Sequence, residues 1–336
     1  MVKRTPSFAK STGADDTIRA VDLPRHRDMW LLTGEINRNS QRTIDARRDL
    51  LSKLSWFLNK RGIELCDTMA LRQFLHYATN GHKEEGGRWG NPRMTRQTKP
   101  GTIKDYHAIL RTFFGWLVLE GIISESPMTR VQAPIDRPDQ IQPFSDEQLR
   151  ALLSAARKSI HPVRDEAIIL LLLDTGLRAS EICALTCGDI DIHIGQCHVE
   201  SGKGGKSRAV PFSRDVRRLL VRHLDERRCP TSAPLFVSNR GMSTGDKLTR
   251  SGLAQLLRRL GKAAGIEGVR CSPHTMRHSF SIGFLRAGGN VFTLQTMLGH
   301  SHMAMTSRYV ALAQADIVNQ HRQYSPVTRL KGGRGK

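Results

Sequence analysis

The sequence predicts a mainly α-helical protein of two domains, with a small β-hairpin in the second. Apolar residues recur at helical spacing through most of the 336 residues. Residues 129–143 interrupt this pattern with three prolines and no apolar periodicity, which is typical of an interdomain linker. Within residues 189–212 the spacing changes to the strand period around a glycine- and lysine-rich turn. We therefore expect a disordered basic tail over 1–22, a helical domain over 23–128, the linker over 129–143, a larger domain over 144–325 and a second basic tail over 326–336.

The composition is strongly basic, because 52 Lys and Arg residues stand against 31 Asp and Glu residues, for a formal charge of +21. Such an excess favours a polyanionic partner, with nucleic acid first and an acidic membrane surface second. No membrane span is expected, since the longest aliphatic run, Ala167–Leu173, is far too short to cross a bilayer. The six cysteines form no C-x-x-C pair, which is typical of a reduced, cytoplasmic protein.

The first domain is expected to hold three helices and one long loop. The first clear helix begins after Ser40 and ends at Gly62, a second begins near Thr68, and a third covers Thr102–Glu120. The loop between the last two, Asn80–Gly101, is glycine-rich and basic, and loops of this length are usually functional or disordered. Its candidate phosphate contacts are Lys83, Arg88, Arg93, Arg96 and Lys99.

The second domain opens on a capping box, in which Ser145 is the N-cap and Gln148 lies three residues later. The nearly all-apolar segment Val163–Asp174 is expected to be the buried core helix. A short helix over Ala179–Leu185 precedes the β-hairpin, whose two strands flank the turn S-G-K-G-G-K-S. Further helices are expected over Arg214–Glu226, Leu253–Ala264, Pro273–Ala287, Val291–Leu298 and Met303–Ala313.

A run of chemically capable side chains lies near the end of this domain: S-P-H-T-M-R-H-S-F, then L-G-H-S-H, then S-R-Y-V. It contains His274, Arg277, His300 and Tyr309. A guanidinium can donate to two phosphate oxygens at once, an imidazole can accept or donate a proton, and the oxygen of a phenol can attack phosphorus. No carboxylate pair or cysteine-rich cluster accompanies them, so the pattern predicts phosphodiester chemistry without a metal or other cofactor.

Each of these residues also has a plainer interpretation when it is considered alone. Arg178 in T-G-L-R-A-S-E could cap a helix end, Lys203 and Lys206 in the glycine turn could be solvent-exposed, and Tyr309 could be core packing. His274 and His278 have zinc spacing, but Thr275 stands where H-E-x-x-H needs glutamate.

Taken together and in order, the motifs resemble the tyrosine recombinase family of phage integrases and Xer-type resolvases. T-G-L-R-A-S-E-I-C-A-L is similar to the first arginine box of that family. H-T-M-R-H-S-F, followed by L-Q-T-M-L-G-H-S and S-R-Y-V, is similar to the second. The resemblance covers roughly Leu23 to Leu312, and its small departures, Ala179 and Met276, do not fall on reacting groups.

The resemblance implies a role for each group at the scissile phosphate. Tyr309 would be the nucleophile, which forms a 3′-phosphotyrosyl link and releases a 5′-hydroxyl without ATP. Arg178 and Arg277 would clamp the non-bridging oxygens, with Glu181 orienting Arg178.

Three more residues would handle protons in the same reaction. Lys203 would protonate the leaving 5′-oxygen, with Lys206 as the competing lysine of the same turn. His274 would take or share the proton of the tyrosine, and His300 would donate to a phosphate oxygen.

The family resemblance also implies partners and an assembly. A helical, SAM-like core-binding domain and the catalytic domain would form a C-shaped clamp on double-stranded DNA in a bacterial or archaeal cell, associated with the nucleoid. A homo-tetramer would join two DNA sites through a Holliday junction, with Ala313–Gln323 exchanged between protomers. An accessory directionality factor is compatible with this scheme.

Two other interpretations stay open. A relaxing enzyme like type IB topoisomerases would use the same chemistry as a monomer, without a partner site. A non-catalytic DNA-binding regulator would need only the scaffold, although the full set of six residues disfavours it. Within the recombinase interpretation, integration or excision of a mobile element and resolution of DNA multimers remain alternatives.

Overall fold

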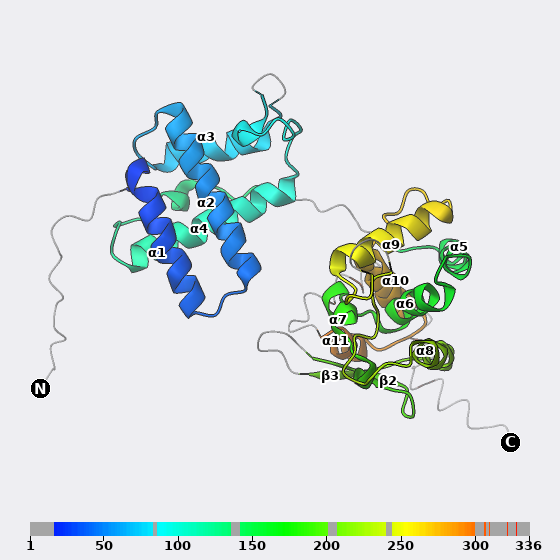
Figure 1. The fold of residues 1–336 in the computed structure, drawn as a ribbon. Coiled ribbons are helices and arrows are strands. Elements are labelled where there is room, and N and C mark those ends of the chain that lie inside the picture. Colours follow the sequence, from blue (N-terminus) through cyan, green and yellow to red (C-terminus); the bar gives the residue numbers. More distant parts are fainter. Residues whose placement is uncertain are drawn as a thin grey trace, which may run out of the picture. The chain divides into compact units, whose positions relative to one another are not determined.

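The chain folds into helices with a small sheet, organised as two compact units, Met1–Asp139 and Gln140–Lys336 (Figure 1). The computed structural model describes residues 17–82, 86–135, 142–200, 207–239 and 244–299, together with Thr306, Tyr309, His321 and Val327. Asp139, the last residue of the first unit, lies inside the proline-containing segment 129–143. Among the helices of the described ranges, none is long and apolar enough to cross a membrane.

In its described residues, the first unit packs four helices around an aromatic and aliphatic core. They are α1 (Leu23–Ile36), α2 (Gln41–Arg61), α3 (Thr68–Thr79) and α4 (Pro100–Leu119), with 3₁₀ turns at Ala20–Asp22, Arg88–Gly90 and Pro127–Arg130. Ser40 accepts a hydrogen bond from the Thr43 amide at the start of α2, and Gly62 ends that helix in the left-handed region. Leu54 of α2, Phe74 of α3 and Phe113 of α4 are fully buried at the centre.

Two expectations at the N-terminal side of this unit are wrong. The basic tail was predicted to extend to residue 22, but Ile18 and Ala20 are buried in the core. Backbone hydrogen bonds hold this segment to the chain beyond α2: Ala20 N–H donates to Glu64 O at 2.7 Å, and Cys66 N–H donates to Ile18 O at 2.9 Å. Helix α1 was missed because its apolar residues do not form one stripe, since Leu32 and Ile36 are exposed while Trp30 and Leu31 are buried.

The predicted loop Asn80–Gly101 yields a correction for Arg88, which was grouped with the phosphate contacts. Arg88 is only 7% exposed. Its guanidinium donates to Ala78 O and, at 2.7 Å, to Arg96 O, so it holds the loop against α3 and cannot reach a phosphate. Arg93, Arg96 and Lys99 are exposed. Lys83 lies outside the described residues.

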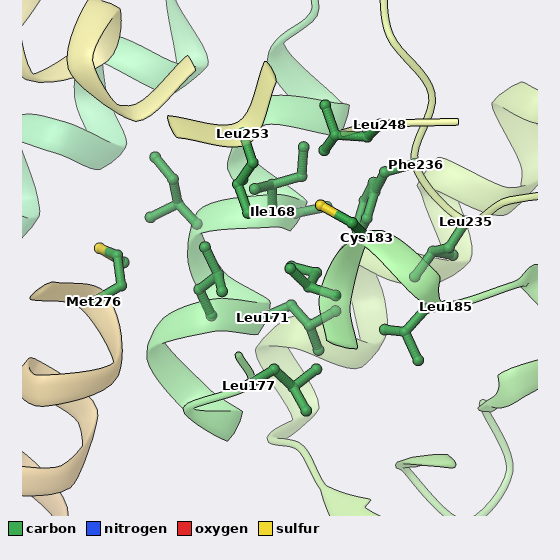
Figure 2. Close-up of a cluster of buried hydrophobic side chains, with 14 of the residues drawn as sticks. Ile168, Leu171, Leu177, Cys183, Leu185, Leu235, Phe236, Leu248, Leu253 and Met276 are labelled. Carbon is green, nitrogen blue, oxygen red and sulfur yellow. The ribbon is translucent and has the colours of Figure 1, made fainter. Parts of the chain in front are cut away.

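The second unit surrounds the apolar helix α6. Within residues 142–299 its helices are α5 (Asp146–Arg157), α6 (Pro162–Thr175), α7 (Ala179–Ala184), α8 (Arg214–Arg227), α9 (Arg250–Ala263), α10 (Pro273–Arg286) and α11 (Val291–Leu298), with a 3₁₀ turn at Cys187–Asp189. Ile168 and Leu171 of α6 pack with Leu253 of α9 and Met276 of α10 in one buried cluster (Figure 2). The predicted capping box of α5 is confirmed, with Ser145 accepting from the Gln148 amide and Gln148 accepting from the Ser145 amide.

The sheet of this unit has three antiparallel strands in the order β1-β2-β3: β1 (Ile190–Asp191), β2 (Gln196–Val199) and β3 (Arg208–Pro211). The register pairs Cys197 with Ile190 on one side and with Val210 on the other. The segment predicted as the first strand of a hairpin is therefore two strands. Gly195 turns the chain between them with φ +82°, and the alternating isoleucines that suggested a continuous strand run into this turn.

Candidate active site

Four of the six predicted catalytic residues, Arg178, His274, Arg277 and Tyr309, are among the described residues. Lys203, Lys206 and His300 lie outside them, and so does nearly all of the segment Ala313–Gln323 that was predicted to be exchanged between protomers. The described part of the site therefore consists of the two arginines, the histidine, the tyrosine and the groups that hold them.

Arg178 stands at a sharp helix-to-helix junction. Helix α6 ends at Gly176, which has φ +61°, and a Cβ atom there would collide with the Phe280 ring, so glycine satisfies both the backbone and the packing. Leu177 then fills the core, and Arg178 occupies the N-cap position of α7. Its side chain remains 38% exposed, so the motif T-G-L-R delivers a guanidinium to the surface of the domain.

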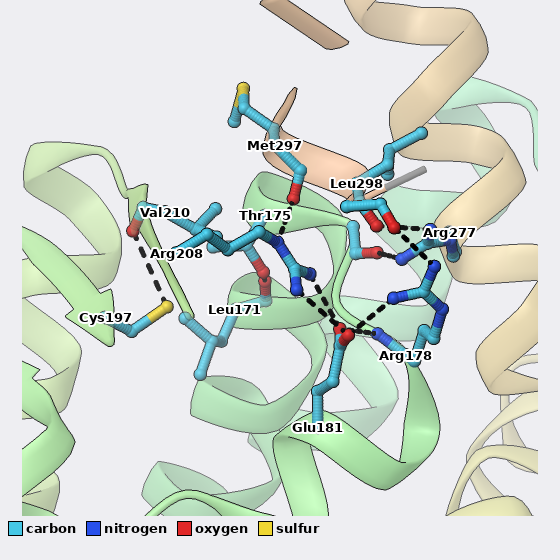
Figure 3. A network of polar contacts seen from close by, with 12 residues as sticks. Leu171, Thr175, Arg178, Glu181, Cys197, Arg208, Val210, Arg277, Met297 and Leu298 are labelled. Atoms are coloured by element: carbon cyan, nitrogen blue, oxygen red, sulfur yellow. Dashed lines mark hydrogen bonds and ion pairs between the residues drawn. The ribbon is translucent and has the colours of Figure 1, made fainter. Parts of the chain in front are cut away.

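Glu181 holds Arg178 in this position. Its carboxylate accepts from the Arg178 backbone N–H at 2.8 Å and from Arg178 Nη1 at 2.7 Å, while Arg178 Nη2 donates to Gly299 O at 3.0 Å (Figure 3). The predicted orienting role of Glu181 thus has direct contacts to support it. The guanidinium is fixed from both its ends.

Arg208 is a second partner of Glu181 and was not among the residues predicted from the motifs. Its Nη1 and Nη2 donate to the two oxygens of Glu181 at 3.1 and 2.9 Å (Figure 3). A signal was available, because Arg208 shares a strand face with the buried Val210 and a buried arginine needs an anionic partner. Burial raises the pKa of Glu181, but the bonds from Arg208 and Arg178 outweigh it and lower that pKa to about 2. The carboxylate therefore stays ionised at neutral pH.

Arg277 lies on α10 and is buried, with its guanidinium directed at two helix ends. Nη1 donates to Gly176 O at 2.7 Å, and Nη2 donates to Leu298 O at 2.9 Å. Both carbonyls belong to the C-terminal ends of helices, α6 and α11, where backbone oxygens lack helical partners and the helix dipole favours a cation. Burial, with the nearby charge of Arg178, lowers the pKa of Arg277 to about 10, so it remains a cation at neutral pH.

Tyr309 is brought to α10 by packing. Its side chain is 3% exposed and belongs to a buried cluster with Phe280, Leu294 and Leu298. The Tyr309 ring contacts His278, with ring centroids 5.1 Å apart, and His278 is the residue that follows Arg277 on α10. The structure therefore places the candidate nucleophile beside a candidate phosphate-binding arginine.

His274 reaches this group through His278. The two Nε2 atoms are 2.9 Å apart in a hydrogen bond, and the rings meet edge to face with centroids 4.2 Å apart. His274 is exposed while His278 is buried, so the pair runs from the surface to the Tyr309 ring. From the sequence alone, His278 was expected only as a possible zinc partner of His274. Helical i, i+4 spacing predicted the contact but not its role.

The assembled groups suit a phosphodiester. Two guanidinium groups, held at the ends of three helices, can neutralise a phosphate, while an imidazole pair and a phenol supply proton transfer and a nucleophile. Within the described part of the chain, no group of three or more His, Cys, Asp or Glu side chains could hold a metal ion.

Comparisons with known proteins agree with this chemistry. The model of the phage integrase family matches residues 143–316. Tyrosine recombinase XerD of Ralstonia nicotianae is 32% identical over 306 residues, which cover 89% of this chain and 91% of that protein. Tyrosine recombinase XerC of Alcanivorax borkumensis is 32% identical over 285 residues, 81% of each protein.

The solved structures show the same fold. The Tn1549 transposon integrase in complex with circular intermediate DNA superposes with a TM-score of 0.68 at 20% identity, over 90% of this chain and 100% of that one. The family model matches most of the second unit, and the two relatives align with both units. Together they establish the family of this chain. The chain belongs to the phage integrase family of tyrosine recombinases, enzymes that transfer DNA strands.

Proposed function

We propose that this chain is a site-specific recombinase that cuts and rejoins double-stranded DNA through a 3′-phosphotyrosyl intermediate on Tyr309. The observation that carries the proposal is the grouping of Arg178, Arg277 and Tyr309 around the C-terminal end of α11. The formal charge of +21 supports DNA as the partner, and the related Tn1549 integrase was solved with DNA.

In this proposal the Tyr309 oxygen attacks the scissile phosphorus and the bond to the 5′-oxygen breaks. The phenol proton passes to the His274–His278 pair, and Lys203 returns a proton to the departing oxygen. Arg178 and Arg277 balance the charge on the non-bridging oxygens in the transition state. Attack by the 5′-hydroxyl of another strand reverses the step, so no ATP is consumed.

The proposed assembly is a homo-tetramer that joins two DNA sites and passes through a Holliday junction. Its role would be integration or excision of a mobile element, or resolution of DNA multimers. The relatives at 32% identity are named recombinases, which favours strand exchange between two sites over simple relaxation of DNA. The buried anchors of both arginines favour an enzyme over a non-catalytic regulator, because a binding scaffold gains nothing from such a cluster.

The function is tested by identifying the residue that becomes linked to DNA. Wild-type protein is incubated with nicked duplexes drawn from the flanks of its gene and from a random-sequence pool, so that the released 5′-hydroxyl fragment diffuses away. After denaturation and digestion, mass spectrometry should find a nucleotide attached to the peptide that contains Tyr309. Attachment at another residue, or a duplex that is bound tightly without any covalent product, would contradict the proposal.

A second prediction concerns the loop of the first unit. Neutralising its exposed arginines, Arg93→Gln with Arg96→Gln, should reduce the slope of log K against log salt by about 0.9 per lost phosphate contact. The control, Arg218→Gln with Arg222→Gln, removes the same charge from α8, where both arginines pair with acids. Titrations with duplex DNA across a salt series give both slopes. An unchanged slope in the loop variant would place this loop away from DNA.

A further inference from the structure

We propose that Arg208 is a positioning residue of the active site: it does not touch the phosphate, but it holds the two arginines that do. The inference rests on the proposed function, because the phosphate contacts of Arg178 and Arg277 are part of it. It adds a residue of β3 beneath the two arginines at the start of α7 and on α10.

The first observation is the bidentate ion pair between Arg208 and Glu181. Both oxygens of the carboxylate are occupied by Arg208 and, at the same time, by the backbone and Nη1 of Arg178. One carboxylate thus joins two guanidinium groups. Without Arg208, Glu181 would lose half of its bonds and could rotate away from Arg178, because bidentate pairs fix geometry as well as charge.

The second step is the C-terminal end of α11. Three successive carbonyls of this end each accept from a different arginine: Met297 O from Arg208 Nε at 2.7 Å, Leu298 O from Arg277 and Gly299 O from Arg178. Figure 3 shows the three guanidinium groups gathered around Glu181 and this helix end. Arg208 therefore anchors the same short segment on which both phosphate-binding candidates depend.

The third step is the fit between Arg208 and Gly299. Gly299 has φ +61°, and a Cβ atom there would lie 2.9 Å from Arg208 Nη1 and 3.0 Å from Cζ. The flat guanidinium thus packs against the bare backbone that turns the chain out of α11. A lysine ammonium is a point charge and cannot cover this turn while it bridges Glu181 and Met297.

The exposed fractions of the Arg208 and Arg178 side chains distinguish a positioning residue from a phosphate-binding one. The Arg208 side chain is 10% exposed and its Nε, Nη1 and Nη2 atoms all donate inward, whereas the Arg178 side chain is 38% exposed. A phosphate arriving from solvent meets Arg178, with Arg208 behind it. Arg208 acts through Glu181 and α11, which is the arrangement expected of a supporting layer beneath a functional group.

The chain offers a matched control in Arg164. This arginine is also buried. Its Nε and Nη2 donate to Asp165 Oδ1 at 2.9 and 2.6 Å, and its Nη1 donates to Val237 O at 2.9 Å. It lies on α6 in the same unit but contacts neither Glu181 nor the end of α11. Arg164→Met therefore removes an equivalent buried ion pair without disturbing the proposed site.

The test compares Arg208→Met, Arg208→Lys and Arg164→Met on a nicked duplex that wild-type protein cleaves. The rate of covalent complex formation is measured at saturating protein, together with DNA affinity and thermal unfolding. We expect Arg208→Met to lower the rate by about 10²-fold, comparable to the loss of a preorganised transition-state donor, with affinity changed less than about threefold. Arg208→Lys should recover part of the rate. Arg164→Met should keep the rate within about threefold of wild type while losing similar thermal stability, because it breaks a buried ion pair.

A second substrate separates positioning from general damage. Replacing one non-bridging oxygen of the scissile phosphate by a methyl group removes the charge that Arg178 and Arg277 neutralise. The defect of Arg208→Met relative to wild type should then shrink to within a few-fold. A defect of equal size on both substrates, an equal rate loss in Arg164→Met, or an unimpaired Arg208→Met would overturn the inference. If wild-type protein forms no covalent complex at all, the proposed function fails and the inference fails with it.

Discussion

Tyr309→Phe should abolish the covalent protein–DNA complex while leaving DNA affinity unchanged within about threefold. The substitution removes only the hydroxyl oxygen, and the other described catalytic candidates, Arg178, His274 and Arg277, carry no hydroxyl that could attack in its place. The ring itself is buried against His278 and the cluster of Phe280, Leu294 and Leu298, and phenylalanine keeps that packing. Because removal of a nucleophile costs enzymes on the order of 10⁶-fold in rate, no product should be detected on a denaturing gel.

Tyr106→Phe is the matched control for this experiment. Tyr106 lies in the first unit, where its hydroxyl accepts from Lys53 Nζ at 3.4 Å, so the same atom is removed far along the chain from the motifs. This variant should form the complex at the wild-type rate. A complex that persists in Tyr309→Phe with unchanged yield would assign the nucleophile to another residue.

Arg277→Lys should lower the rate of complex formation by roughly 10²- to 10³-fold at saturating protein. The lysine keeps the positive charge but cannot donate to Gly176 O and Leu298 O while it also presents N–H groups to a phosphate. The loss should fall on the rate rather than on DNA affinity, because the charge of the transition state exceeds that of the bound phosphate. Single-turnover kinetics with a nicked duplex separate the two quantities.

Arg286→Lys provides the comparison on the same helix. Arg286 is exposed in the last turn of α10, so its replacement should leave both the rate and the unfolding temperature near wild-type values. Arg277→Lys also leaves one of two buried carbonyls with a weaker partner, which should cost about 1 to 3 kcal/mol of unfolding free energy. A wild-type rate in Arg277→Lys would remove Arg277 from the reacting centre.

Most helices could be predicted because their apolar residues face one core. In α2 the residues Ile44, Leu51, Leu54 and Leu58 are buried on one face, and the expected boundaries at Ser40 and Gly62 match the observed caps. The end of the buried helix at Gly176 and the bounds Val291–Leu298 were predicted for the same reason, since caps and glycines act locally.

The errors in the fold arose where burial was decided at long range. Helix α1 packs against α2, and the segment around Ile18 bonds to the chain near Cys66, and no local pattern encodes either contact. The turn at Gly195 was missed because the alternating isoleucines that precede it keep the strand period up to the turn itself. Arg88 was taken for a surface charge, because composition cannot tell a cation that reaches solvent from one that holds backbone carbonyls.

The sequence by itself determined which groups are available and where the helices that carry them end. Its motifs identify Arg178, Arg277 and Tyr309 as candidate catalytic residues. Its glycines at 176 and 299 mark the C-terminal ends of two helices. Only the tertiary structure decided that these ends meet, with Arg208 and His278 behind them. The physical reason is that a helix end or a cap depends on neighbours within a few residues. A guanidinium bonded to a carbonyl more than a hundred residues away, as in Arg178 and Gly299, depends on how whole elements pack.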